Sequence, residues 1–424
     1  MTGILTDLYE LTMAAGYFET GKSAECGTFE LTIRRLPKNR EYVLTAGLQQ
    51  ALEYLLNLRF TPEEIDYLRS LPQFARVSSG FFEHLRDFRF TGDVWAAPEG
   101  TVLFAGEPIM TVRAPLMESQ IPETYLLSTL TFQTLIATKA SRMSRNAAGR
   151  GVVEFGTRRA HTPEAGVLGA RAAYIGGCIG TSNTLAGYRF GIPVMGTCAH
   201  SWVMSFESEI EAFRSLQKLL GPHTIQLVDT YDPVEGVRRA AELGRPLWGI
   251  RLDSGDFLTY SKEARAILDA AGLRDAKIMA SGDLDEWRIA ELLAAGAPID
   301  AFGVGTELAT SGDAPSMGAI YKLVEVDRRD TAKWSEDKTS LPGRKQLFRF
   351  PDRDVLALAS EPPPQGAEPV LRQVIAKGQL VEAPPPLESI REYAAESLRT
   401  VAPRPLEHSA PLTALMDRVR NERK

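Results

Sequence analysis

The segment from residue 224 to residue 256, TIQLVDTYDPVEGVRRAAELGRPLWGIRLDSGD, decides the fold class. Short apolar runs at residues 224–228 and 247–252 lie on either side of a stretch with helical character, residues 233–243. Both runs lack a polar face, which is typical of strands that are covered on both sides. The order strand, helix, strand is typical of a parallel sheet with crossover helices.

The same alternation continues on both sides of this segment. The predicted strands are residues 152–155, 193–196, 224–228, 247–252, 277–280 and 299–304. The predicted helices follow residue 155, begin near residue 206, and then cover residues 233–243, 261–271 and 284–295. The pattern indicates an α/β fold, but alternation by itself fits an open sheet as well as a barrel.

Polar residues of the kinds used in catalysis follow every predicted strand. These stretches are residues 154–159, 196–201, 229–232, 251–256, 281–283 and 303–306. A βα barrel builds its site from the carboxyl ends of its strands. Six successive matches are difficult to obtain by accident, so we favour an irregular α/β barrel over an open sheet.

The two ends of the chain are predicted to form a second, α+β domain. A chain of 424 residues is too long for one ordinary core. Residues 1–115 mix helical and strand patterns, whereas residues 325–424 are polar and rich in proline. We expect this tail to fold back onto the N-terminal region, which leaves residues 116–324 for the barrel.

Composition and charge exclude several classes of protein. The formal charge of −6 argues against a general nucleic-acid-binding protein, although local arginine clusters can still bind small anions. No uncharged apolar run is long enough to span a membrane, and the N-terminus lacks the basic region of a secretory signal. Cys26, Cys178 and Cys198 have no metal-binding spacing. We therefore expect free thiols in a cytoplasmic protein.

Two glycine-rich stretches are candidates for phosphate binding. In Gly303-Val304-Gly305-Thr306, glycines would allow backbone N–H groups to approach a phosphate, and Thr306 can donate its hydroxyl. Residues 176–183 form a second stretch of small residues, for which tight helix packing is a serious alternative. Most glycine pairs simply form a turn, so neither stretch is decisive by itself.

Charged residues near the strand ends suggest how an anionic substrate is held. The candidate cations are Lys139, Arg142, Arg158, Arg159, Arg171 and Arg251. Surface ion pairing is the usual role of arginine, but Arg251 lies in a buried-looking strand two residues before Asp253. Asp229, Asp232 and Asp253 are candidates for binding sugar hydroxyls or Mg²⁺ on a diphosphate. Asp232 precedes Pro233 and fits a helix N-cap equally well.

His200 is the histidine with a chemical context, since it follows Gly-Thr-Cys-Ala at a strand end. It is a candidate nucleophile or general base, although satisfied core histidines are common. The sequence lacks Gly-x-Ser-x-Gly and Gly-x-Gly-x-x-Gly. Residues 16–23 match the P-loop pattern, but a helix precedes and a strand follows, which is the reverse of the required order. We interpret that match as chance, with Gly21 ending the helix.

The combination of motifs resembles the nicotinate phosphoribosyltransferase family. The matching stretches are TDLYELTM (residues 6–13), EFGTRR (154–159), GTSN (180–183), GTCAHS (196–201), LVDTYD (227–232), RLDSGD (251–256) and DKTSLPG (337–343). They occur in order between residue 4 and about residue 346, and together they are far more specific than any single motif.

The resemblance implies an irregular α/β barrel packed on a second domain that both chain ends build. It implies a cytoplasmic homodimer with sites at the subunit interface. The expected reaction joins nicotinate to 5-phosphoribosyl 1-diphosphate and gives nicotinate mononucleotide and diphosphate for NAD salvage. ATP hydrolysis would be coupled to this transfer through a phosphohistidine, which by motif position is His200, and Mg²⁺ would accompany the diphosphate.

The resemblance also implies roles for individual residues. Phe155 and Tyr9 would stack on the pyridine ring, with Tyr9 coming from the partner subunit. Arg158 and Arg251 would contact charged substrate groups, and Asp253 and Ser254 the ribose. Asp229 and Asp253 would lie near Mg²⁺. The loops around the 5-phosphate would contain Gly282, Asp283, Gly303, Gly305 and Thr306. Residues 337–343 would form a loop that reaches back to the site.

Substrate choice depends on Ser182 and Asn183. We expect an Asp at position 183 in related nicotinamide-using enzymes, where it would repel a ring carboxylate. The neutral pair in this sequence favours nicotinate. The alternatives are a quinolinate or nicotinamide phosphoribosyltransferase, a barrel aldolase and a non-catalytic binding protein. An aldolase is disfavoured because Lys277, the candidate Schiff-base lysine in the strand series, lies at a strand start.

Overall fold

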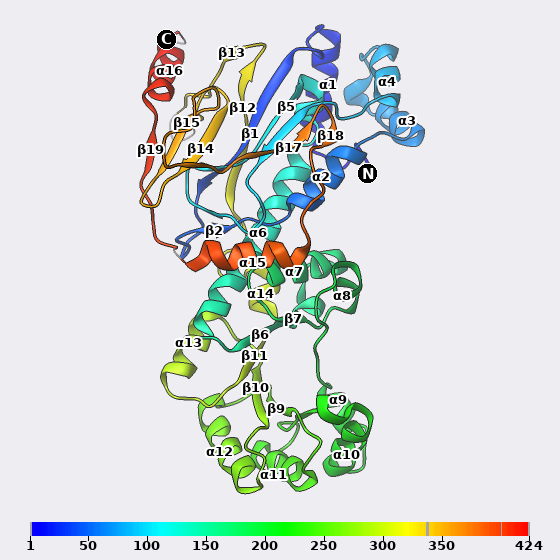
Figure 1. Cartoon of the computed structure of the whole chain (residues 1–424). Helices are drawn as coiled ribbons and strands as arrows, with labels where there is room; N and C mark the ends of the chain where they lie inside the picture. The colour runs from blue at the N-terminus through cyan, green and yellow to red at the C-terminus, as the bar shows by residue number, and fades with distance from the viewer. Residues whose placement is uncertain (1, 336–338, 400, 423–424) are drawn as a thin grey trace. The chain divides into compact units, whose positions relative to one another are not determined.

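A computed structural model describes residues 2–335, 339–399 and 401–422. The chain divides into two compact units. Unit 1 comprises Met1–Leu135 and Ser316–Lys424, and unit 2 comprises Ile136–Pro315 (Figure 1). The sequence had placed these boundaries after residues 115 and 324. They fall elsewhere because α5 (Leu116–Gln120) packs on the sheet of unit 1 and β12 (Gly318–Val326) pairs with it.

Unit 2 contains a six-stranded sheet in which all neighbouring strands are parallel. Its order is β7-β6-β11-β10-β9-β8. The strands are β6 (Gly151–Glu154), β7 (Gly180–Thr181), β8 (Ile225–Leu227), β9 (Gly249–Leu252), β10 (Lys277–Ser281) and β11 (Ala301–Val304). The sheet confirms the predicted α/β class.

The strand order explains why this unit is an irregular barrel. The strands β8, β9, β10 and β11 are neighbours in the same order in which they follow one another along the chain. The last strand, β11, then lies beside β6, the first strand, as it would in a closed barrel. Within the described part of the chain, no ladder joins β7 to β8, so the ring has an open seam. The predicted strand at residues 193–196 is wrong except for one bridge between Thr181 and Val194. Pro193 has no N–H to extend that pairing.

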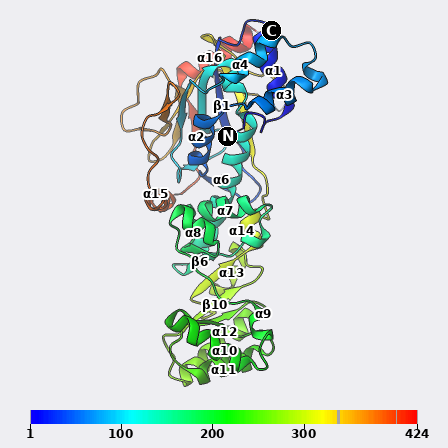
Figure 2. The ribbon, with the colours of Figure 1, turned by 90° about the vertical axis from the view of Figure 1, so that its right-hand side faces the viewer.

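Helices follow the strands of unit 2 almost at once. They are α7 (Pro163–Ile175), α8 (Thr184–Phe190), α9 (His200–Met204), α10 (Glu209–Leu220), α11 (Pro233–Leu243), α12 (Phe257–Ala270), α13 (Glu286–Ala294) and α14 (Thr306–Thr310). Side chains of Asp232 and Asp256 accept N–H bonds at the starts of α11 and α12, so both are N-caps. The helices α10, α11 and α12 lie side by side (Figure 2).

Unit 1 is built around a seven-stranded antiparallel sheet of order β13-β12-β1-β5-β3-β17-β18. Its strands besides β12 are β1 (Cys26–Arg35), β3 (Asp93–Ala96), β5 (Pro108–Pro115), β13 (Arg329–Asp330), β17 (Arg372–Ala376) and β18 (Gln379–Leu380). β12 pairs with β1 and β17 with β3, which confirms that the C-terminal tail folds onto the N-terminal region.

Two smaller sheets complete unit 1. A four-stranded sheet has the order β16-β14-β15-β19, and β2 pairs with β4. The strands are β2 (Val43–Leu44), β4 (Val102–Leu103), β14 (Lys345–Arg349), β15 (Asp354–Leu358), β16 (Glu368–Pro369) and β19 (Leu406–His408). These strands bring residues from distant parts of the chain into one unit.

The helices of unit 1 cover a core of buried aliphatic and aromatic side chains. Besides α5 they are α1 (Leu8–Glu19), α2 (Leu48–Asn57), α3 (Pro62–Ser70), α4 (Ser79–Arg86), α15 (Leu387–Arg399) and α16 (Ala410–Asn421), while α6 (Glu123–Asn146) contributes to both units. Thr61 and Glu64 form the predicted capping box. The P-loop-like match begins in the last turn of α1 and continues past its end, where Gly21 adopts a positive φ of 73° and the helix has stopped, as predicted. None of the described helices has the length and apolar character needed to cross a membrane.

Candidate active site

The loop that follows β9 is held in place by Asp229, which follows β8. One carboxylate oxygen of Asp229 accepts the backbone N–H groups of Asp253 (2.7 Å) and Ser254 (2.8 Å) and the Ser254 hydroxyl (3.0 Å). The other oxygen, Oδ1, is buried and has no hydrogen-bond partner among the described residues. Asp229 therefore positions the two residues that were predicted to contact ribose.

Asp253 lies at the centre of a cluster of polar groups. Its Oδ1 accepts the Ser281 hydroxyl at 2.5 Å and is 3.7 Å from Nη2 of Arg251. Burial alone would raise the pKa of Asp253, but the Ser281 hydrogen bond and the Arg251 charge outweigh it and lower this pKa. Asp253 is thus maintained as a carboxylate.

Arg251 is the most enclosed cation of the site, with 12% of its side chain exposed. It donates from Nη1 to the Thr197 hydroxyl. Burial lowers the pKa of its guanidinium, and the neighbouring charge of Arg158 lowers it further. Arg158 is exposed in the short helix Thr157–Arg159. The charge of Arg158 is therefore felt at Arg251, and this positive potential favours an anionic ligand.

His200 is oriented by contacts to both ring nitrogens. Nδ1 is 3.1 Å from the Thr230 hydroxyl, and Nε2 is 3.6 Å from Oδ2 of Asp253. The side chain keeps 37% of its surface exposed, so a substrate can reach the ring. A fixed, accessible imidazole beside a carboxylate is suited to nucleophilic or proton-transfer chemistry.

The glycines at the ends of β10 and β11 permit close packing. Gly282 has a φ of +95°, and a Cβ there would lie 2.0 Å from the Asp253 carbonyl oxygen. A Cβ on Gly303 would lie 2.5 Å from the Phe155 ring. Gly305, before Thr306, instead faces open space, since the nearest atom would be 3.8 Å away. Gly305 is therefore the glycine with room for a ligand beside its backbone.

The strands β6 and β7 place the residues expected to select the substrate. The Glu154 carboxylate is buried and accepts from the Gly156 N–H and the Thr181 hydroxyl, and burial raises its pKa. Asn183 Oδ1 accepts the Ala186 N–H at 2.9 Å and caps α8. That oxygen is occupied structurally, so the contribution of Asn183 to a ligand would come from its amide NH₂.

Some predicted site residues have other positions or roles. Tyr9 lies on α1 in unit 1, with 46% of its surface exposed, whereas the strand-end residues lie in unit 2. Lys139 and Arg142 were expected near an anionic substrate, but both pair with the buried Glu286, at 2.6 and 2.8 Å. The buried Arg171 packs over the Phe190 ring. Asp337 and Lys338 of the DKTSLPG motif lie outside the described residues.

Sequence reasoning overlooked four side chains that orient the site. They are Thr197, Thr230, Ser281 and Glu154. All four lie within the polar stretches at the strand ends, where hydroxyl groups beside a candidate Arg, Asp or His were the available signal.

A metal site made by protein side chains alone is not present in the described ranges, where no group of three or more His, Cys, Asp and Glu has the required geometry. The unpartnered Oδ1 of Asp229 and the carboxylate of Asp253 are nevertheless suited to a cation that a substrate brings. Mg²⁺ commonly takes only one or two carboxylates and completes its shell with phosphate oxygens and water.

Comparisons with known proteins agree on one family. The model of the nicotinate phosphoribosyltransferase N-terminal domain matches residues 4–131, and that of the nicotinate phosphoribosyltransferase family matches residues 151–338. Nicotinate phosphoribosyltransferase pncB2 of Mycobacterium tuberculosis is 43% identical over 99% of this chain and 92% of its own length. The Bacillus subtilis nicotinate phosphoribosyltransferase is 45% identical over 81% of this chain and 72% of its own length.

Solved structures extend the similarity to the whole fold. The human nicotinic acid phosphoribosyltransferase has a TM-score of 0.87 at 30% identity and covers 98% of this chain and 100% of its own. A Pyrococcus furiosus protein described as nicotinate-nucleotide pyrophosphorylase has a TM-score of 0.78 at 28% identity and covers 94% and 95%. The similarity therefore includes both units and the strand ends of unit 2.

Proposed function

The chain belongs to the nicotinate phosphoribosyltransferase family, and we propose that it transfers phosphoribosyl from 5-phosphoribosyl 1-diphosphate to nicotinate in NAD salvage, with ATP hydrolysis coupled to the transfer. The observation that supports this most directly is the Arg251–Asp253–His200 cluster on the loop that Asp229 holds. It combines a buried cation, a carboxylate and an accessible imidazole. These are the groups that an anionic sugar phosphate and a phosphoryl donor require.

In the proposed transfer, the ring nitrogen of nicotinate attacks C1 of the ribose as the bond from C1 to the diphosphate oxygen breaks. Diphosphate leaves with that electron pair. Positive charge develops at the sugar, and the Asp253 carboxylate would stabilise it while Ser254 binds ribose hydroxyls. Arg251 and Arg158 would bind the negative groups of the substrates. Gly282, Asp283, Gly303, Gly305 and Thr306 would form the loops around the 5-phosphate.

His200 would carry phosphate from ATP. Its Nε2 would attack the γ-phosphorus as the bond to ADP breaks, and water would later hydrolyse the phosphohistidine. The contact between Nδ1 and the Thr230 hydroxyl would keep the ring in position. Mg²⁺ near Asp229 and Asp253 would neutralise charge on the diphosphate.

Ring recognition would use Phe155, with Tyr9 of the partner subunit on the opposite face, in a cytoplasmic homodimer. The neutral Ser182 and Asn183 would admit the carboxylate of nicotinate. A subunit contact at this part of unit 1 is supported by a group of exposed apolar side chains, which are Tyr9 and its neighbours Leu5, Leu8 and Met13.

The first test is product formation from nicotinate, 5-phosphoribosyl 1-diphosphate and Mg²⁺, with and without ATP. Nicotinamide and quinolinate are assayed in parallel. Nicotinate mononucleotide alone, with more formed when ATP is present, is the expected result. Product from another acceptor would replace the substrate assignment, and no product from any acceptor would favour a binding protein.

The second test separates ATP coupling from transfer. His200→Ala should lose ATP hydrolysis while retaining slow, ATP-independent transfer. His223→Ala is the matched control, because His223 is an exposed histidine in unit 2 outside the cluster. Unchanged ATP hydrolysis in His200→Ala would refute the phosphohistidine role.

A further inference from the structure

Unit 1 contains a cavity of about 530 Å³ that the proposed reaction does not use. Its walls come from β5, β12, β13, the β14–β15 pair and α16. Volumes of about 300–1,000 Å³ are typical of sites for small molecules. All of its lining residues belong to unit 1, whereas the Arg251–Asp253–His200 cluster belongs to unit 2.

Three arginines border the cavity, and two of them have no carboxylate partner. Arg418 pairs with Asp330 at 2.8 Å. Arg113 and Arg344 make no ion pair within residues 2–335, 339–399 and 401–422. In the same ranges, Nε of Arg113 is buried without a hydrogen-bond acceptor. Two guanidinium groups therefore border one cavity without a direct ion pair of their own among the described residues.

The side chain of Arg344 is fixed by an aromatic ring. Its guanidinium carbon is 4.3 Å from the centre of the Trp95 ring, so a cation–π contact takes the place of an ion pair. Burial lowers the pKa of Arg344 and the nearby charge of Arg113 lowers it further, while the charges of Glu325, Glu30 and Asp93 offset only part of the shift. An anion between these arginines would remove their mutual repulsion and satisfy their N–H groups.

The remaining lining residues restrict the kind of anion. Asp330 and Glu325 contribute negative charge, which disfavours a triphosphate or another highly charged anion. Leu358 and Leu415 provide an apolar wall for an organic group. Guanidinium groups bind phosphate oxygens in a bidentate manner, and two of them match the charge of one phosphate monoester.

We propose that this cavity binds a small organic phosphate monoester, with the phosphate between Arg113 and Arg344 and the organic group against Leu358 and Leu415. The lining residues include none of the catalytic residues proposed above, and Gly343 is the only one of them that belongs to a motif of the family, DKTSLPG. The ligand of this cavity is therefore a molecule that the enzyme binds without transforming it at this position.

Phenyl phosphate is a suitable probe because it combines one phosphate with one apolar ring. Binding to the full chain is measured by calorimetry, and tryptophan fluorescence reports on the ring under Arg344. The wild type should bind phenyl phosphate saturably with a change in emission. Trp95→Phe should lose most of this emission change while phenyl phosphate still binds in the calorimeter.

Arginine variants decide whether binding occurs in this cavity. Arg113→Gln and Arg344→Gln should each weaken binding by about tenfold or more, since each removes charge-assisted hydrogen bonds. Arg344→Lys should have a smaller effect. Arg69→Gln is the matched control, because Arg69 also lies over an aromatic ring, that of Phe82 at 4.9 Å, but does not line the cavity.

Three results would overturn the proposal. The first is unchanged affinity in both Arg113→Gln and Arg344→Gln, which would place the probe elsewhere on the protein. The second is no saturable binding at about 10 mM, where a site with a millimolar Kd would be filled. The third is equally tight binding of benzoate, which would exclude a preference for phosphate. Circular dichroism checks folding, and Arg113→Gln decides if Arg344→Gln does not fold.

Discussion

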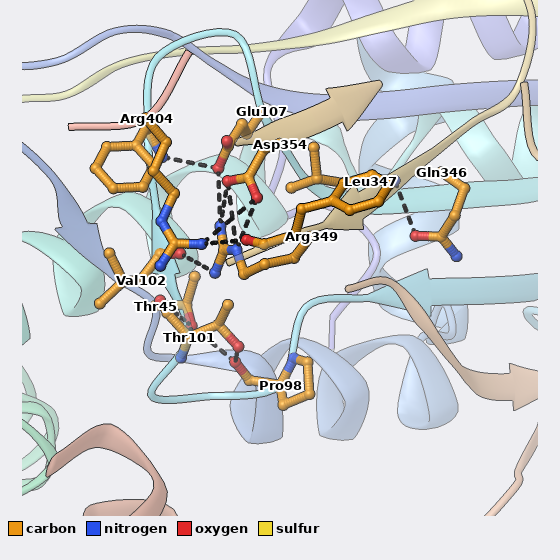
Figure 3. A network of polar contacts seen from close by, with 12 residues as sticks. Thr45, Pro98, Thr101, Val102, Glu107, Gln346, Leu347, Arg349, Asp354 and Arg404 are labelled. Atoms are coloured by element: carbon orange, nitrogen blue, oxygen red, sulfur yellow. Dashed lines mark hydrogen bonds and ion pairs between the residues drawn. The ribbon is translucent and has the colours of Figure 1, made fainter. Parts of the chain in front are cut away.

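Glu107→Gln should make unit 1 more stable at neutral pH, because Glu107 is a carboxyl group that the fold keeps protonated. Glu107 is 1% exposed and lies beside Asp354, which is fully buried (Figure 3). Its Oε2 accepts the Phe104 N–H at 2.9 Å and is 3.5 Å from Nη2 of Arg349. Burial raises the pKa of Glu107 to about 8, and the charge of Asp354 contributes, while Arg349 offsets only part of the shift.

The direction of the effect follows from the raised pKa of Glu107. The ordinary pKa of this group is 4.5, so below pH 4.5 the proton on Glu107 contributes its full amount to the free energy of unfolding. That contribution is lost as the pH rises towards 8. Each pH unit between these two values lowers the free energy of unfolding by about 1.4 kcal/mol. A glutamine cannot ionise in the unfolded chain, so it avoids this cost. Its oxygen can accept from Phe104 and its NH₂ can donate to Asp354.

The expected gain is therefore largest near neutral pH. Because unfolded wild-type protein gains free energy by releasing the proton, Glu107→Gln should be more stable by about 2–3 kcal/mol at pH 7. At pH 5 the difference in the free energy of unfolding between Glu107→Gln and wild type should fall below about 1 kcal/mol, because pH 5 is only slightly above the ordinary pKa of the group.

Urea unfolding at pH 5, 6, 7 and 8 provides the measurement. The midpoint of Glu107→Gln should change less with pH than that of wild type, with an unchanged m value. Glu368→Gln, at an exposed glutamate of β16, is the matched control and should follow wild type. Equal pH dependence of wild type and Glu107→Gln between pH 5 and 8 would refute a shared buried proton at this position.

Three further substitutions test contacts that hold unit 2 together. Asp229→Ala leaves two partly buried backbone N–H groups of the loop after β9 without their acceptor, so it should cost about 1–2 kcal/mol and lower kcat/KM; full activity would contradict the positioning role. Lys139→Met removes one of the two cations that pair with the fully buried Glu286 and leaves only Arg142, so it should lower the free energy of unfolding by about 3 kcal/mol, measured in urea. Gly282→Ala places a Cβ 2.0 Å from the Asp253 carbonyl oxygen, at a residue with a positive φ. The value of kcat/KM should therefore fall at least tenfold, which corresponds to about 1.4 kcal/mol. An unchanged kcat/KM would show that the loop relaxes freely.

Much of the fold was predictable because local patterns determine single elements. The predicted helix at residues 233–243 coincides with α11, and Asp232 is its N-cap. Successive parallel strands end at one edge of the sheet, so the polar stretches after them were expected to meet. His200, Asp253 and Arg251 do meet there.

The roles of several charged residues were not predictable from the sequence. Lys139 and Arg142 were expected near a substrate, yet both pair with Glu286, which is more than a hundred residues away along the chain. The two-residue β7 was also missed, since so short a strand has no periodicity to detect. Its existence depends on pairing with β6.

The sequence by itself determined the α/β alternation, the helix starts and the chemical groups at the strand ends, because each depends on residues that are neighbours in the chain. The tertiary structure alone decided that Asp229 supports the loop of Asp253, that Thr230 orients His200, and that Glu107 shares an enclosed site with Asp354. The physical reason is that burial and hydrogen-bond partnership depend on packing between distant segments, and these in turn determine which carboxyl groups keep their charge.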